Sequence, residues 1–377
     1  MTFSLKSLRS YVIYLVYIFL IISIGSHFFA NYIFNQNRFP DLHNKLEKNP
    51  VYSLLSPDTF SQSGEKILFV GDSYTQGAGD AYRDGVYDYS IAHLLARDKH
   101  VSVYNAGLSG HGNLAAARNA MWLDKLFRLP LLNRGFPSFD RIVFFFYEGN
   151  DLNNNLEEYE IFDHPEGVKE IISMSDPSFD DIVQFGYLSG LFIVDKSIQR
   201  FINPERDEAS PDIIEGNTIN PDSGYTNKLH AGDSIWFAPP LQAAAVELYD
   251  NEVDSALQMF FNSILALREY FEVEHLDIVY IPSPATIYSR PEIIEIQSYE
   301  KRKSHISSRK NSSRSKLIRS RIRDFTNQLQ INFIDPTDRI IAEAREKFVH
   351  GPIDEKHLNK FGYGILYKFW MEQSDIH

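Results

Sequence analysis

The chain has no cysteine among its 377 residues. Disulfide bonds, thiolate metal sites and a cysteine nucleophile are therefore excluded, whereas the redox compartment is left open. The chain also has fewer basic than acidic residues. The 37 Lys and Arg against 50 Asp and Glu give a net charge of −13. This balance argues against a nucleic-acid partner, which would require a basic surface against the phosphates. The 44% of hydrophobic residues indicates a globular protein with a packed core.

Charged side chains are missing from one long segment near the start of the chain. Residues 11–34 contain no Lys, Arg, Asp or Glu and are mostly apolar, and about 20 apolar residues suffice for a helix to cross a bilayer. We predict a cytoplasmic tip and a single-pass transmembrane helix over residues 1–34, followed by a polar tether over residues 35–63. A cleaved signal peptide is the alternative. Basic residues lie on both sides of the span, so charge alone does not orient it.

Short apolar runs alternate with helical patterns from residue 64 onward. Buried strands are expected at residues 67–70, 101–104, 141–147, 276–281 and 331–334. Helices are expected between the first three strands, over about 241–273, over 338–348 and at the C-terminus. This βαβ alternation predicts an α/β domain over residues 64–377, built on a five-stranded parallel sheet.

Two segments depart from this alternation. Residues 152–240 are acidic, rich in proline and without a continuous period, so we predict a loop-rich insertion or flap on the functional face. Residues 301–323 hold a run of Lys and Arg, which fits a solvated helix face or an attraction to an anionic polymer or lipid headgroups.

Ser73 follows the first predicted strand almost directly. The strand stops at Gly71, and Ser73 comes two residues later. Gly, Asp and Ser are ordinary turn residues, so the stretch alone could be a simple turn. In open α/β sheets, however, ligands lie outside the carboxyl ends of the strands, where a serine hydroxyl could meet a substrate. Ser73 is therefore our candidate nucleophile.

Asp354 and His357 lie three residues apart near the C-terminus. At this spacing the Asp can accept a hydrogen bond from one ring nitrogen of the His and leave the other facing the serine hydroxyl. A serine needs such a base to be nucleophilic at neutral pH. A metal pair is the weaker reading, because no His-Glu-x-x-His motif or second ligand cluster completes it. We predict no metal and no cofactor.

Acyl transfer also needs hydrogen-bond donors for the developing oxyanion. The backbone N–H groups of Ser73 and of a glycine in the second strand-end loop could supply two, and the side-chain amide of Asn150 a third. That loop contains Gly107 and Gly110 among its glycines.

Four blocks in this order resemble the SGNH (GDSL-type) hydrolase family. They are Gly71-Asp72-Ser73, the loop of Gly110, Gly149-Asn150-Asp151 and Asp354-x-x-His357. The resemblance implies a three-layer α/β/α sandwich of flavodoxin-like type. It also implies Ser73 as nucleophile, His357 as base and acid, and Asp354 as its orienter. The oxyanion donors that it implies are Ser73, Gly110 and Asn150, with Gly107 as the rival of Gly110. The Gly-x-Ser-x-Gly elbow of α/β-hydrolases is absent, since Thr75 stands where its second glycine would be.

Family members include esterases, lipases, thioesterases, deacetylases and O-acetyltransferases, and the fold does not choose among them. The predicted anchor is similar to that of membrane-attached members acting on cell-surface or exported polysaccharide. We therefore expect an ester hydrolase acting on an O-acylated glycan, with its catalytic domain outside the cytoplasm. The alternatives are an O-acetyltransferase for an exported polysaccharide and a non-catalytic glycan-binding scaffold.

Overall fold

The protein is described from a computed structural model. It describes residues 17, 64–79, 89–99, 101–128, 138–162, 164–165, 167–178, 227–288, 292–298, 302–351 and 354–374. Every helix and strand below belongs to the unit formed by residues 41–176 and 213–377. Among the described residues, no helix combines the length and apolar character that a membrane crossing requires. Apart from Tyr17, the predicted anchor and tether lie outside these residues.

A five-stranded parallel sheet forms the centre of this unit, in the order β2-β1-β3-β6-β9. The predicted α/β class and parallel sheet are thus confirmed. The strands are β1 (Lys66–Val70), β2 (Ser102–Asn105), β3 (Arg141–Tyr147), β6 (His275–Ile281) and β9 (Asn332–Ile334). Each lies within a few residues of its predicted position.

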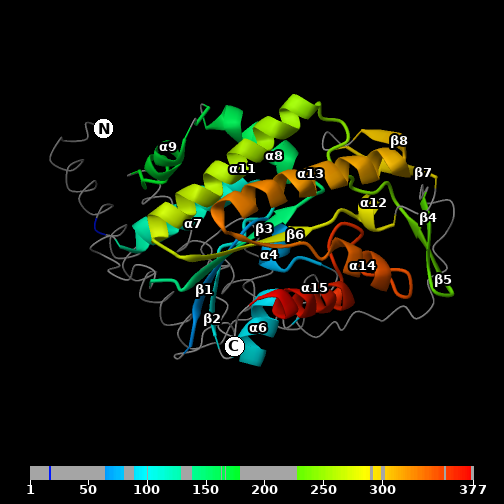
Figure 1. Ribbon diagram of the computed structural model, residues 1–377, viewed down its shortest axis with the longest axis horizontal. Coiled ribbons are helices and arrows are strands. Elements are labelled where there is room, and N and C mark those ends of the chain that lie inside the picture. Colours follow the sequence, from blue (N-terminus) through cyan, green and yellow to red (C-terminus); the bar gives the residue numbers. More distant parts are fainter. Residues whose placement is uncertain are drawn as a thin grey trace, which may run out of the picture. The chain divides into compact units, whose positions relative to one another are not determined.

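Helices cover both faces of the sheet (Figure 1). One face carries α7 (Asn113–Phe127), α8 (Asp151–Ile161), α11 (Asp250–Phe271) and α13 (Ser308–Leu329). The other carries α6 (Ile91–Lys99), α14 (Thr337–Glu343) and α15 (Lys360–Gln373). Two further short helices are α9 (Val168–Ser173) and α12 (Pro284–Ile287).

The central strand β3 shows why both faces are covered. Phe144 and Phe146 pack against Phe260 of α11, with ring centroids 5.5 Å and 4.8 Å apart. Phe145 points the opposite way and packs at 5.1 Å against Phe69, which meets Trp370 of α15 at 5.6 Å. Successive side chains of a strand alternate between faces, so a continuous run of buried aromatics requires a helical layer on each side.

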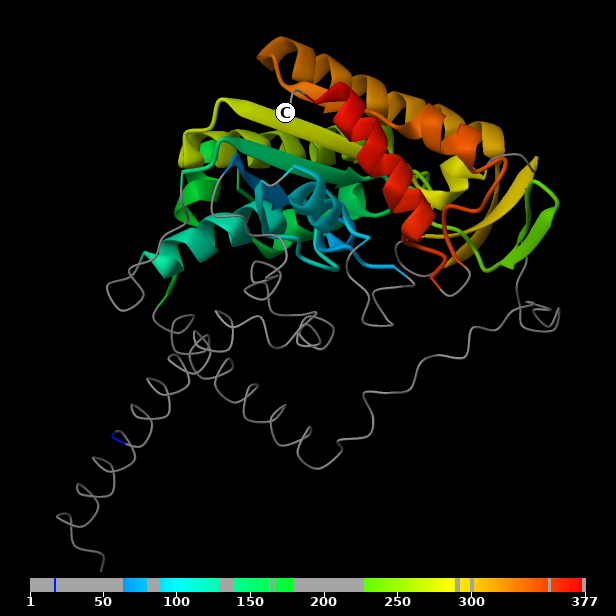
Figure 2. The ribbon, with the colours of Figure 1, turned by 90° about the horizontal axis from the view of Figure 1, so that it is seen from below.

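Two small antiparallel hairpins lie side by side at one end of the described part (Figures 1 and 2). They pair β4 (Asn227–Ala231) with β5 (Ser234–Ala238), and β7 (Ile293–Gln297) with β8 (Lys303–Ser307). The side chain of Asn227 joins them through hydrogen bonds to the backbone of Glu295.

The prediction of a helix from about residue 241 was wrong at its start. Leu241 instead bonds through its backbone to β7, and α11 begins only at Asp250.

The prediction of a loop-rich segment from residue 152 was also wrong at its start, because α8 follows β3 directly. Its buried face carries Asp151, Asn154, Asn155 and Glu158. These residues have the i, i+3, i+4, i+7 spacing of a helix face, but they are polar. A search for apolar periodicity therefore misses this helix. Residues 179–226, the rest of the predicted flap before the first hairpin, lie outside the described residues.

The basic run of residues 301–323 includes the strand β8 and the larger part of α13. Several of its arginines pair with acidic residues at distances of 3.0 to 3.4 Å, namely Arg314 with Asp250, Arg319 and Arg323 with Asp335, and Arg321 with Asp254. These arginines therefore contact other parts of the fold.

Candidate active site

Ser73 lies at the carboxyl end of β1, on the first turn of the short helix α4 (Ser73–Gln76). The turn into this helix requires glycine at position 71, where φ is +151° and a Cβ would come 2.2 Å from Thr75 Oγ1. Asp72 caps the helix by accepting the Tyr74 N–H at 2.9 Å. The chain thus changes direction between Val70 and Ser73 and fixes the serine at the edge of the sheet.

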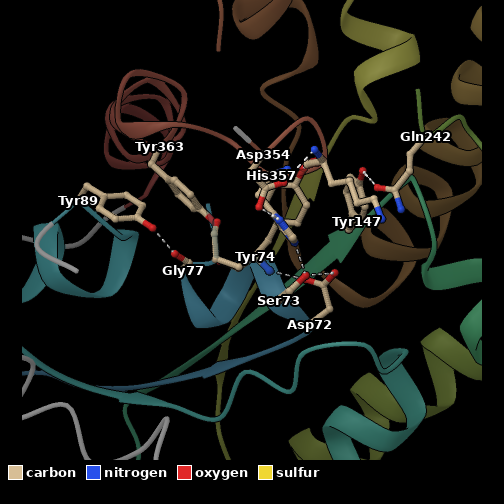
Figure 3. A network of polar contacts seen from close by, with 12 residues as sticks. Asp72, Ser73, Tyr74, Gly77, Tyr89, Tyr147, Gln242, Asp354, His357 and Tyr363 are labelled. Atoms are coloured by element: carbon tan, nitrogen blue, oxygen red, sulfur yellow. Dashed lines mark hydrogen bonds and ion pairs between the residues drawn. The ribbon is translucent and has the colours of Figure 1, made fainter. Parts of the chain in front are cut away.

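His357 stands between Asp354 and Ser73 (Figure 3). Its Nε2 atom is 2.8 Å from Ser73 Oγ, and its Nδ1 atom is 2.8 Å from Asp354 Oδ2. Both contacts have hydrogen-bond length. With Nδ1 protonated and bonded to the carboxylate, Nε2 is left as an acceptor for the serine proton. The structure therefore brings the three residues predicted from the sequence into one connected chain.

The Asp354 carboxylate is held on both oxygens. Its Oδ2 meets the His357 ring, and its Oδ1 accepts the backbone N–H groups of Lys356 at 3.0 Å and His357 at 3.1 Å. Burial opposes ionisation of this carboxyl, but these bonds and the charge of His357 outweigh burial and hold the pKa of Asp354 below its ordinary value of 3.8. Asp354 therefore stays an acceptor and keeps the imidazole oriented.

A second carboxyl group, that of Asp72, lies beside the serine. Ser73 Oγ is 3.4 Å from Asp72 Oδ2, a longer contact than the 2.8 Å to His357 Nε2. The hydroxyl proton is therefore directed mainly at the imidazole. Burial raises the pKa of Asp72 to about 6, against the lowering effects of the Tyr74 N–H bond, the charge of His357 and the Ser73 hydroxyl. When ionised, Asp72 adds negative charge near a protonated His357.

His350 is a second histidine near this segment, but it is not placed as a base. It is buried, and its Nδ1 is 3.3 Å from the hydroxyl of Tyr288. Burial lowers the pKa of His350 to about 3, so its ring stays neutral at physiological pH. Of these two histidines, only His357 contacts the serine hydroxyl.

The second strand-end loop distinguishes its two candidate glycines. Gly107 N–H already donates to Asn105 Oδ1 at 3.0 Å, and a Cβ at this position would come 2.5 Å from Gln76 N. Gly107 therefore allows the loop to approach α4 closely. Gly110 has φ of +77°, and a Cβ there would meet nothing within 4 Å. Because the N–H of Gly107 is already bonded to a side chain, Gly110 remains the candidate donor of this loop.

Asn150 sits at the start of α8, immediately after β3. It occupies the N-cap position but makes no side-chain cap hydrogen bond. Its Oδ1 atom is buried without a hydrogen-bond partner among the described residues. An amide at a helix start usually accepts an N–H of the first turn, so Asn150 leaves this structural role unused. Ser73, as the first residue of α4, likewise has a backbone N–H without a partner inside its helix.

The polar face of α8 holds the loop that carries Gly110. Glu158 accepts the N–H groups of Gly112 at 2.5 Å and Ala115 at 2.9 Å. Asn155 exchanges hydrogen bonds with Asn113 at 2.7 and 3.0 Å. Burial raises the pKa of Glu158 to about 7, although the two N–H groups favour its ionised form. The helix missed in the sequence therefore supports the strand-end loop next to the candidate site.

Of the five residues predicted for the site, three follow strands of the central sheet and two precede the last helix. Ser73 follows β1, Gly110 follows β2, Asn150 follows β3, and Asp354 and His357 precede α15. Sequence reasoning gave no role to Asp72, Tyr74 or Glu158. Asp72 lay within the quoted Gly-Asp-Ser stretch, but nothing in the sequence indicates the contacts of the other two, because their partners are distant along the chain.

The described part of the chain holds no group of three His, Asp or Glu side chains placed to bind a metal ion. Comparison with protein-family models gives no match for this chain, and neither does comparison with curated proteins.

Proposed function

We propose that the protein is a serine-dependent ester hydrolase of the SGNH type, acting through an acyl-serine intermediate. The observation that carries this proposal is the pair of 2.8 Å contacts that His357 makes with Ser73 and Asp354. The parallel sheet with helices on both faces, and the order of the four sequence blocks, agree with the SGNH fold. The chemistry is proposed from the site, because a fold hosts many activities.

In the first half-reaction, Ser73 Oγ attacks the carbonyl carbon of the ester while its proton passes to His357 Nε2. Asp354 stabilises the resulting imidazolium through Nδ1. Collapse of the tetrahedral intermediate breaks the bond to the alcohol, which leaves with the proton from His357. The acyl group then remains on Ser73. The N–H groups of Ser73 and Gly110 and the amide of Asn150 are the proposed donors to the oxyanion.

In the second half-reaction, His357 takes a proton from the acceptor, whose oxygen attacks the acyl carbon. The bond from this carbon to Ser73 Oγ then breaks, and Ser73 takes back the proton from His357. Water as acceptor gives hydrolysis, and a sugar hydroxyl gives O-acyl transfer. The same three residues serve both outcomes. We favour hydrolysis of an O-acylated glycan, with the transferase as the alternative outcome of the test below. The predicted span over residues 11–34 supports a location in the membrane. The resemblance to membrane-attached members that act on exported polysaccharide supports a catalytic domain outside the cytoplasm.

Product analysis tests this proposal. The full-length chain in detergent is incubated with a small acetyl ester and a series of oligosaccharides, and free acetate and acetylated sugar are both measured by mass spectrometry. We expect acetate release that is lost in Ser73→Ala. Sugar acetylation faster than acetate release would replace the hydrolase by the transferase. Activity on lipid esters alone would remove the glycan assignment, and glycan binding without any turnover would favour the non-catalytic scaffold.

The membrane arrangement has a separate test. A reporter that works only after export is fused to the C-terminus, and a reporter that works only in the cytoplasm is fused in a parallel strain. Activity of the first alone is the expected result. Activity of the second alone would reverse the orientation, and a mature protein that begins after residue 25 would replace the anchor by a cleaved signal peptide.

A further inference from the structure

The peptide unit between Lys356 and His357 is held from two sides. Its N–H, that of His357, donates to Asp354 Oδ1 at 3.1 Å. Its carbonyl, that of Lys356, accepts a hydrogen bond from the hydroxyl of Tyr74, a residue 282 positions away. Because this peptide carries the Cα of His357, its orientation sets where the imidazole lies. One of the two bonds goes to Asp354, and the other comes from the residue directly after Ser73.

Tyr74 is itself fixed by its surroundings (Figure 3). Its side chain is 1% exposed, and its ring packs against those of Tyr147 at 4.4 Å and His357 at 5.1 Å between centroids. Its backbone carbonyl accepts the hydroxyl of Tyr363 at 3.3 Å. Burial raises the pKa of Tyr74 well above 10, so the hydroxyl keeps its proton and remains a donor. A buried, packed aromatic ring has little freedom to move its hydroxyl.

The backbones of the two segments also approach each other closely. A Cβ at Gly79, just beyond α4, would come 2.6 Å from the carbonyl oxygen of Leu358. The hydroxyl of Tyr363 in α15 reaches the carbonyl of Ala78 at 2.8 Å. The His357 segment therefore packs closely against the Ser73 segment, and the hydroxyl of Tyr74 bonds to the peptide that leads into His357.

We infer that Tyr74 is a positioning residue for the proposed reaction, which holds His357 over Ser73 through the carbonyl of Lys356. The inference rests on the proposed function, since it concerns the base of that reaction. Tyr74 has no role in proton transfer. Its ring limits the tilt of the imidazole, and its hydroxyl fixes the peptide that bears it, so the 2.8 Å contact between Nε2 and Oγ is formed before substrate binds.

The test is Tyr74→Phe in the full-length chain in detergent. This change keeps the ring packing and removes only the hydroxyl. We expect kcat for a small acetyl ester to fall about tenfold with KM unchanged, the scale of one lost hydrogen bond in the transition state. Labelling of Ser73 by a fluorophosphonate should slow by a similar factor, and the acid limb of the pH–rate profile, which reports protonation of the base, should move.

Tyr270→Phe is the matched control. It also removes a tyrosine hydroxyl from a hydrogen bond, the one that Tyr270 of α11 donates to Asp124 Oδ2 of α7 at 2.8 Å, on the face of the sheet opposite α15. We expect this control to lower the melting temperature while leaving the acid limb of the pH–rate profile in place. If both variants reduce kcat in proportion to their loss of stability, Tyr74 has only a structural role and the inference is overturned.

A second measurement does not depend on turnover. The NMR resonance of the ring N–H that His357 directs at Asp354 should shift or broaden in Tyr74→Phe and stay unchanged in Tyr270→Phe. An unchanged resonance in Tyr74→Phe, together with unchanged labelling, overturns the inference. If Ser73 is not labelled in the unaltered protein, the proposed function itself is contradicted. Failure of the inference about Tyr74 can therefore be told apart from failure of the proposed function.

Discussion

The Nε2 atom of His357 lies 2.8 Å from the hydroxyl oxygen of Ser73, although 284 positions separate the two residues. The contact joins the end of the first strand to the segment before the last helix. Asp354, on the other side of the imidazole, fixes the proton of Nδ1. A hydroxyl, an imidazole and a carboxylate in this order are the parts that acyl transfer through serine requires.

The carboxylate of Asp354 should matter for the imidazole more than for the fold. In Asp354→Asn, the amide can donate to His357 Nδ1 and so favour the wrong tautomer, and kcat for an acetyl ester should fall about 10⁴-fold. Asp335→Asn is the matched control, since that carboxylate pairs with Arg319 and Arg323 of α13. Ester turnover measured for both variants checks this. Equal activities of the two would show that Asp354 does not orient the base.

Asn150 should contribute to turnover and little to stability. Because its side chain makes no cap hydrogen bond, Asn150→Ala removes no capping energy, whereas kcat should fall about 10²–10³-fold if the amide donates to the oxyanion. Asn359, by contrast, caps α15 by accepting the Gly362 N–H at 3.0 Å. Asn359→Ala also removes the bonds from Nδ2 to the carbonyls of Phe348 and His350, so it should cost more stability than the about 1 kcal/mol of a lost cap. Steady-state kinetics and thermal unfolding of both variants test the distinction, and a stability loss without a kinetic effect in Asn150→Ala would refute it.

Asp72 should make the fold less stable as the pH rises. Burial raises its pKa from 3.8 to about 6, so the folded state prefers the protonated carboxyl. Its contribution to the free energy of unfolding is full below pH 4 and decreases as the pH rises through about 6. Asp72→Asn keeps an oxygen for the Tyr74 N–H and removes this titration. Melting temperatures between pH 4 and 7 should therefore fall less in the variant, and parallel curves for the two proteins would contradict the assignment.

The central strands and the grouping of Ser73, Asp354 and His357 could be predicted because their signals are local. The run from Arg141 to Tyr147 is apolar throughout, and the spacing of Asp354 and His357 is visible in four residues. Helix α8 could not be found this way, since its buried face is formed by Asp151, Asn155 and Glu158, which bond to polar partners rather than to an apolar core.

Contacts between segments that are distant along the chain could not be predicted from the sequence either. The bond from Tyr74 to Lys356 links segments that no periodicity connects. The choice between Gly107 and Gly110 depended on which N–H is already taken by a side chain, here that of Asn105. The start of α11 depended on the backbone pairing of Leu241 with β7, a strand about fifty residues further along the chain.

The most direct measurement is the position of a covalent adduct. The full-length chain is treated with a fluorophosphonate, digested, and analysed by mass spectrometry. The account predicts a single adduct on Ser73, formed more slowly in His357→Ala and absent in Ser73→Ala, with thermal unfolding confirming that both variants are folded. An adduct that persists in Ser73→Ala, or no adduct in the unaltered protein, would contradict the assignment of Ser73 as the nucleophile.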